Sequence, residues 1–178
     1  MIFSTWFLVK VTIYACKLLA ATSICLQLKQ DIIQFKKSGK KFATITAYDY
    51  TSTQIVEEAG VPLILVGDSA SMVIYGYDTT IPVSMEEMLF VVKAVTRASR
   101  SALIVADMPF LSYQSSVEDA VKNAGFLMKT GDVGAVKLEG GLNIKEHIKK
   151  IVGFGIPVMG HVGLTPQSVH QFGGYKVQ

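Results

Sequence analysis

Two aspartates of the sequence each follow a short apolar run. Asp68 comes after residues 63–67, and Asp107 comes after residues 103–106. If both runs are buried strands, the two carboxylates project toward the same end of a sheet, where they repel each other unless a cation lies between them. Magnesium typically takes one or two carboxylates and keeps water or substrate oxygens as its other ligands. The pattern therefore predicts a magnesium site at Asp68 and Asp107, to which Glu139 could add a third carboxylate.

The sequence does not favour a zinc site. Its only two cysteines, Cys16 and Cys25, are remote from the aspartates, and its three histidines form no ligand pair at helical spacing. A hard cation with oxygen ligands remains the simplest partner.

Four polar residues, Glu139 among them, also stand in or near apolar runs. Lys137 and Glu139 are two residues apart on a predicted strand, so their side chains share a face. They could form a structural ion pair with neighbouring strands. Alternatively, Lys137 could bind a substrate carboxylate or oxyanion while Glu139 supports the metal shell. His161 could be a core histidine or a supporting site residue, and Tyr48 is expected mainly to pack.

The elements that position these residues alternate along the chain. Apolar runs with strand character alternate with segments whose apolar residues recur at helical spacing. The predicted strands are residues 42–46, 62–66, 102–106, 135–138 and 157–159, and the predicted helices are residues 52–59, 85–98, 117–129 and 144–152. Ser84 with Glu87, and Ser115 with Glu118, have the spacing of capping boxes that begin two of the helices. This alternation predicts right-handed crossovers and a parallel sheet.

Two α/β architectures satisfy that alternation, an open doubly wound sheet and a closed (β/α)8 barrel. An open sheet binds its ligand at one switch point, whereas a barrel collects functional groups from the ends of several strands. Polar residues follow all five predicted strands, which favours the barrel. The sequence contains neither a G-x-G-x-x-G nor a G-x-x-x-x-G-K-[ST] pattern, so dinucleotide and P-loop sites are disfavoured.

Composition limits the class of protein. The chain has 178 residues, of which 50% are hydrophobic, and its 17 basic residues are spread among 14 acidic ones. We expect one globular domain without a nucleic-acid partner.

Residues 1–28 contain no acid, and their uncharged runs are too short for a membrane span. We therefore expect an apolar extension over residues 1–28 and a barrel portion over residues 29–178. A cytoplasmic location is expected, or a mitochondrial one if the extension is a transit segment.

Seven strings together resemble the ketopantoate (3-methyl-2-oxobutanoate) hydroxymethyltransferase family, and they cover roughly residues 36–178 in the family's order. They are TAYDY at 46–50, VGDS at 66–69, GYDTT at 76–80, ADMPF at 106–110, VKLEGG at 136–141, GHVGLTPQS at 160–168 and FGGYKVQ at 172–178.

The resemblance implies a (β/α)8 barrel of the phosphoenolpyruvate and pyruvate type, assembled into homo-oligomers. It implies transfer of a hydroxymethyl group from 5,10-methylenetetrahydrofolate to 3-methyl-2-oxobutanoate through a magnesium-stabilised enolate. By this resemblance Asp68, Asp107 and Glu139 form the magnesium shell, while Ser69 and Lys137 join the two aspartates in binding the 2-oxo acid. The family's general base, a glutamate on a later strand, would lie beyond Gln178.

About five of the eight βα units of such a barrel are present in the sequence. We therefore expect a partial barrel that lacks turnover by itself. Two other interpretations remain open. The chain could belong to another magnesium-dependent oxo-acid enzyme, such as an isocitrate lyase relative, or it could be a non-catalytic fragment with an interaction role.

Overall fold

Five parallel strands form one sheet whose spatial order, β1-β2-β3-β4-β5, is also their order in the sequence. The computed structural model describes residues 32–174, so the predicted extension over residues 1–28 lies outside the described residues. The strands are β1 (Thr44–Thr46), β2 (Leu63–Val66), β3 (Leu103–Asp107), β4 (Ala135–Glu139) and β5 (Val158–His161). This sequential parallel order is the one expected for consecutive units of a (β/α)8 barrel, and the predicted α/β fold class is confirmed.

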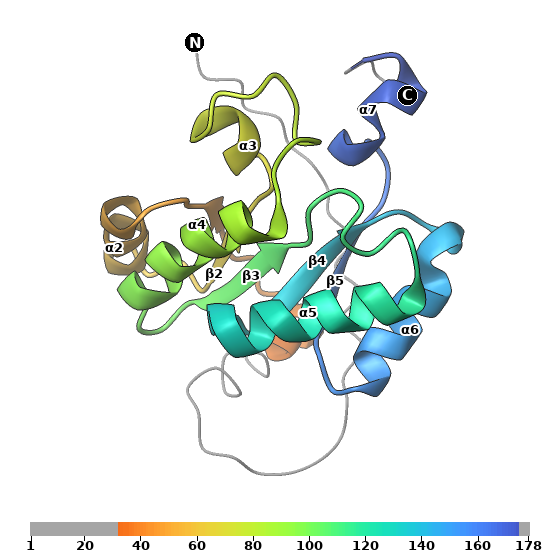
Figure 1. The fold of residues 1–178 in the computed structure, drawn as a ribbon. Helices are drawn as coiled ribbons and strands as arrows, with labels where there is room; N and C mark the ends of the chain where they lie inside the picture. Colours follow the sequence, from red (N-terminus) through yellow and green to blue (C-terminus); the bar gives the residue numbers. More distant parts are fainter. Residues whose placement is uncertain (1–31, 175–178) are drawn as a thin grey trace.

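The helices that connect the strands cover one face of the sheet (Figure 1). They are α2 (Tyr50–Glu58), α4 (Met85–Ala98), α5 (Val117–Gly131) and α6 (Lys145–Gly153). All four predicted helices are present, with boundaries that differ by a few residues. Because the helices and strands alternate, every crossover places a helix on the same side, and the opposite face becomes the inner face of the partial barrel.

Local capping determines where these helices begin. The predicted box at Ser84 is present, since Ser84 Oγ accepts from the Glu87 N–H and the Glu87 carboxylate accepts from the Ser84 N–H. The predicted box at Ser115 is wrong. Ser116 caps α5 by accepting a hydrogen bond from the Asp119 N–H, while the Ser115 hydroxyl donates to the Asp119 carboxylate. The helix begins at Val117, as predicted, and its cap lies one residue later than the pattern predicted.

Two cores lie on opposite faces of the sheet. The larger one fills the space between the sheet and the outer helices and includes Ile64, Met88 and Leu127. The smaller one lies on the inner face, where Leu103 and Val105 pack among apolar neighbours and a helix over residues 32–38 contributes Ile32. Strands that are buried on both faces read as continuous apolar runs, which explains the sequence of β2 and β3.

Short elements follow the carboxyl ends of three strands. They are α3 (Ala70–Val73) after β2, the 3₁₀ helix η1 (Leu142–Ile144) after β4, and the 3₁₀ helix η2 (Pro166–Ser168) with α7 (Val169–Phe172) after β5. The helices α3 and α7 lie beyond the strand ends in Figure 1. The sequence patterns did not predict these elements, because a helix of one turn has no measurable periodicity. They surround the end of the sheet where the predicted site residues lie.

Candidate active site

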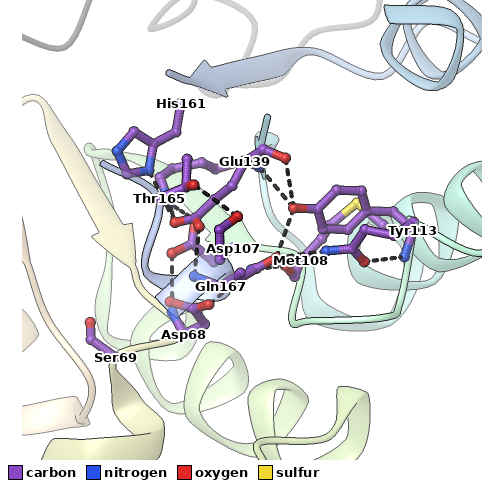
Figure 2. A network of polar contacts seen from close by, with 12 residues as sticks. Asp68, Ser69, Asp107, Met108, Tyr113, Glu139, His161, Thr165 and Gln167 are labelled. Carbon is purple, nitrogen blue, oxygen red and sulfur yellow. Dashed lines mark hydrogen bonds and ion pairs between the residues drawn. The ribbon is translucent and has the colours of Figure 1, made fainter. Parts of the chain in front are cut away.

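Four charged side chains gather where β2, β3 and β4 end (Figure 2). Asp68 and Asp107 are each 3% exposed, Glu139 is 6% exposed and Lys137 is 8% exposed. The Asp68 backbone N–H donates a 3.0 Å hydrogen bond to Asp107 Oδ2, which brings the two predicted metal ligands side by side. Residues in register on parallel strands point to one face, so Asp107 and Lys137, which are paired on β3 and β4, both face the inside of the partial barrel.

Lys137 is the one lysine within this group. Its ammonium lies 2.5 Å from Asp107 Oδ1 and 3.6 Å from Glu139 Oε1. Burial acts to lower the pKa of Lys137, but the negative charges of Asp107 and Glu139 outweigh it and raise the pKa above its usual value. The lysine is therefore a cation at neutral pH. The structural ion pair that the sequence allowed is present in the structure.

Glu139 is held from three sides. Its Oε1 lies 3.0 Å from His161 Nδ1, and its Oε2 accepts a 3.0 Å hydrogen bond from the Gln167 backbone N–H. Burial acts to raise the pKa of Glu139, whereas the contacts with His161, Lys137 and Gln167 lower it, and the net direction is down. Glu139 is thus an anion whose two oxygens already have protein partners. The sequence allowed His161 to be either a core histidine or a supporting site residue. In the structure it lies beside this carboxylate.

The cluster contains more negative than positive charge. Burial, followed by the charge of Asp107, raises the pKa of Asp68 to about 7. Burial likewise raises the pKa of Asp107, although Lys137 opposes the shift. Three carboxylates surround one lysine, and a divalent cation would offset the excess charge. Over residues 32–174, no set of three or more histidine, cysteine or acidic side chains has the arrangement of a metal centre. Two carboxylates with water or substrate oxygens still suffice for magnesium.

The backbone at residue 67 packs so closely against the site that a side chain would not fit without a shift. A Cβ added to Gly67 would lie 2.7 Å from Ser69 Oγ, 3.6 Å from Asp107 Oδ2 and 3.7 Å from the methyl carbon of Thr46. The side-chain oxygens of Ser69 and Asp107 therefore border a position that any other residue would fill. Glycine at position 67 therefore lets the Ser69 hydroxyl keep its present position.

Tyr48 does more than pack. It contacts the outer core, as expected, and its hydroxyl also lies 2.6 Å from Ser69 Oγ. Burial raises the pKa of the Tyr48 phenol, and the hydrogen bond to Ser69 only partly opposes that shift, so the phenol stays neutral at physiological pH. Tyr48 thus fixes the Ser69 hydroxyl.

Two residues of the site were not predicted from the sequence. Gln167, on η2, contacts Asp68 with its side chain and Glu139 with its backbone. Tyr113 has no exposed surface, and its hydroxyl contacts Gln167 and the Glu139 backbone. Both residues are neutral, so a search for charged residues at strand ends overlooks them. The only available signal was the position of Gln167 within the string GHVGLTPQS.

Comparison with known proteins assigns the family. The sequence profile described as Ketopantoate hydroxymethyltransferase matches residues 27–178. The chain belongs to this family. Among curated relatives, 3-methyl-2-oxobutanoate hydroxymethyltransferase of Carboxydothermus hydrogenoformans is 60% identical over 145 residues, which are 82% of this chain and 52% of the relative. The enzyme of the same name from Geobacter metallireducens is 53% identical over 83% of this chain and 55% of its own length. The chain thus spans about half the length of these family members.

Solved structures support the fold of this member of the ketopantoate hydroxymethyltransferase family. The crystal structure of 2,3-dimethylmalate lyase, a member of the PEP mutase/isocitrate lyase superfamily, matches with a TM-score of 0.58 at 14% identity over 79% of this chain and 53% of the lyase chain. Phosphonopyruvate hydrolase in complex with oxalate and Mg++ matches with a TM-score of 0.52 at 18% identity, over 63% of this chain and 38% of the other. At such identities the likeness concerns the fold alone. No helix within the described part of the chain is both long and apolar enough to cross a membrane.

Proposed function

We propose that this chain provides the magnesium and 2-oxo acid sites of a 3-methyl-2-oxobutanoate hydroxymethyltransferase. The observation that carries the proposal is the pair of buried carboxylates, Asp68 and Asp107, which lie in a cluster with a single lysine. A buried excess of negative charge is costly without a counter-ion, so the arrangement suits a cation and an anionic substrate that binds through it. Family membership supports the choice of reaction.

The charge and position of each residue suggest its role in binding the metal or the substrate. Asp68 and Asp107 would hold the magnesium ion, and Glu139 would support that shell while it orients His161. Lys137 would face the carboxylate or keto oxygen of 3-methyl-2-oxobutanoate, and Ser69, oriented by Tyr48, would donate a hydrogen bond to the same substrate. When bound, magnesium would withdraw charge from the keto group and thereby stabilise the enolate that forms when the C3 proton leaves.

The complete reaction would transfer a hydroxymethyl group from 5,10-methylenetetrahydrofolate to 3-methyl-2-oxobutanoate and give 2-dehydropantoate. We assign no general base among the described residues, because Lys137, Asp107, Glu139 and His161 already contact one another and Asp68 is assigned to the metal. That this polypeptide alone lacks turnover stays a prediction. Assembly into a homo-oligomer and a cytoplasmic location are also predictions, and the curated relatives, which come from bacteria, give no support to a mitochondrial one.

Calorimetric titration of the full chain tests the proposal. With magnesium present, 3-methyl-2-oxobutanoate should bind saturably, and the binding should disappear when a chelator removes the metal. Succinate, as a probe of an isocitrate lyase-like site, should bind more weakly. Asp68→Asn should lower the affinity at least tenfold, which is the expected loss of a charged ligand. Asp132→Asn makes the same change at an exposed position at the end of α5 and should leave it unaltered. A folded wild-type chain that binds no oxo acid would contradict the proposal.

A further inference from the structure

The side-chain amide of Gln167 makes four hydrogen bonds in the middle of the site (Figure 2). Its Nε2 donates to Asp68 Oδ2 and to the Met108 backbone carbonyl, each at 2.9 Å. Its Oε1 accepts from the Tyr113 hydroxyl at 2.7 Å and from Gln114 Nε2 at 2.9 Å. Gln167 is 6% exposed, so these four contacts use the whole hydrogen-bonding capacity of a buried amide.

The partners leave one orientation for the amide. A backbone carbonyl only accepts hydrogen bonds, and so does an ionised carboxylate, so the group that faces Met108 and Asp68 must be the NH₂. If the amide were turned over, its oxygen would face two acceptors in a buried place and lose both bonds. Such a loss costs more than the bonds contribute, because the buried groups are left without partners.

Tyr113 fixes the same orientation from the other side. The Glu139 backbone N–H donates to the Tyr113 hydroxyl at 3.0 Å, so that hydroxyl oxygen is already an acceptor there. The single phenolic proton has two acceptors within reach, the Glu139 carbonyl oxygen at 3.0 Å and Gln167 Oε1 at 2.7 Å, and the shorter contact is the one with Gln167. Burial raises the pKa of Tyr113, so the phenol keeps this proton at neutral pH. The hydrogen bonds of this chain thus point in one direction. The Glu139 N–H donates to Tyr113, Tyr113 donates to Gln167, and Gln167 donates to Asp68.

The donor that reaches Asp68 is neutral. A lysine at this place would hold the carboxylate equally well but would offset its charge, as Lys137 does for Asp107. An amide holds Oδ2 and leaves the negative charge in place. No described residue donates a hydrogen bond to Asp68 Oδ1, so that oxygen is available to a ligand from outside the protein.

We propose that Gln167, oriented by Tyr113, is a positioning residue that fixes Asp68 with one oxygen held and the other free for the metal ion. The proposal rests on the proposed function, since it takes Asp68 as a metal ligand. Through its backbone N–H, the same residue also holds Glu139, so the segment η2 positions two of the three acidic residues of the site.

The test compares metal affinity with fold stability in the full chain. Electron paramagnetic resonance of Mn²⁺, with 3-methyl-2-oxobutanoate present, measures the affinity, and thermal unfolding measures the stability. Gln167→Met keeps the length of the side chain without its donor, and it should weaken Mn²⁺ binding about tenfold, as expected for the loss of a hydrogen bond to a charged group. Gln54→Met is the matched control on the exposed surface of α2 and should bind like the wild type.

Tyr113→Phe supplies a second measurement that leaves the glutamine in place. Without the phenolic proton, the amide loses the contact that fixes its orientation, and Mn²⁺ binding should weaken several-fold. Tyr50→Phe, at a half-exposed tyrosine, serves as its control. The NMR signals of the Gln167 side-chain NH₂ should also shift when Mg²⁺ and the oxo acid are added, which a merely structural amide would not do.

The outcomes separate this inference from the proposed function. If the wild-type chain binds no Mn²⁺ with the oxo acid, the proposed function fails and this inference fails with it. If the wild-type chain binds and folded Gln167→Met binds equally well, only the positioning role is overturned. Should Gln167→Met not fold, Tyr113→Phe decides, because unchanged affinity in that folded variant overturns the role and weakened affinity supports it.

Discussion

Replacing Glu57 by glutamine should weaken the fold at neutral pH and have less effect in acid. Glu57 lies near the end of α2, and its carboxylate accepts hydrogen bonds from the Ala102 N–H at 2.7 Å, the Ser99 hydroxyl at 2.5 Å and the Ser101 hydroxyl at 2.9 Å. The Ser101 N–H donates to it as well. One carboxylate therefore ties α2 to the loop between α4 and β3, at the end of the sheet opposite the site.

The size of the effect follows from the pKa of this carboxyl group. Partial burial acts to raise it, but the hydrogen bonds from Ser99, Ala102 and Ser101 outweigh burial and lower the pKa of Glu57 from 4.5 to about 2. A difference of that size corresponds to roughly 3 kcal/mol of preference for the ionised form in the folded state. Glu57 is only partly buried, so solvent screening reduces the expected contribution to ~1–2 kcal/mol.

The direction of the pKa shift of Glu57 determines the pH range in which the carboxylate stabilises the fold. The folded-state pKa is lowered, so the stabilisation is complete above the unfolded pKa of 4.5 and is lost as the pH falls through about 2. Urea unfolding of the full chain, followed by circular dichroism at pH 7 and at pH 3, should show Glu57→Gln less stable by ~1–2 kcal/mol at pH 7. The difference from the wild type should narrow at pH 3.

The neighbouring Glu58 provides the control, because it is an exposed carboxylate on the same turn of α2. Glu58→Gln should change the free energy of unfolding little at either pH. Equal losses at positions 57 and 58, or a loss at position 57 that is the same at both pH values, would refute the reasoning.

Four other substitutions test further features. Ser84→Ala removes the cap of α4 and should cost ~1 kcal/mol in urea unfolding. Gly67→Ala should lower oxo-acid affinity at least tenfold in calorimetry, because its Cβ would lie 2.7 Å from Ser69 Oγ and force that hydroxyl out of its present position. Gly125→Ala, in a helix and in open space, should instead bind normally and gain up to ~1 kcal/mol of stability. Asp68→Asn should raise the melting temperature of the metal-free chain, since it removes one of the repelling buried charges; a lower melting temperature would contradict this.

The sequence was sufficient to predict the elements that carry strong periodicity. β3 reads as an unbroken apolar run because both of its faces are buried, and α4 shows both a helical apolar stripe and a capping box. The cap of α5 was predicted one residue early, since Ser115 and Ser116 are each followed three residues later by an acid. Only the folded geometry distinguishes the two serines.

The charged residues of the site could be predicted from the sequence, whereas the neutral ones could not. Asp68, Asp107, Lys137 and Glu139 stand at strand ends, and parallel strands bring their carboxyl ends together, so the structure places all four in one buried cluster. Gln167 carries no charge and lies on a 3₁₀ segment without periodicity. The sequence alone could not assign it a partner, because its contacts with other elements exist only after the crossovers have formed.

The contact between Gln167 and Asp68 joins residues 99 positions apart in the chain. Bringing such distant residues together carries a loop-closure cost that only the folding of the intervening strands and helices offsets. The site can therefore form only after β2 to β5 have docked, which makes ligand capture a late event of folding. Conversely, a ligand that binds only the fully formed site stabilises every intervening element by mass action. Hydrogen exchange would then slow on ligand addition even in helices far from the bound molecule.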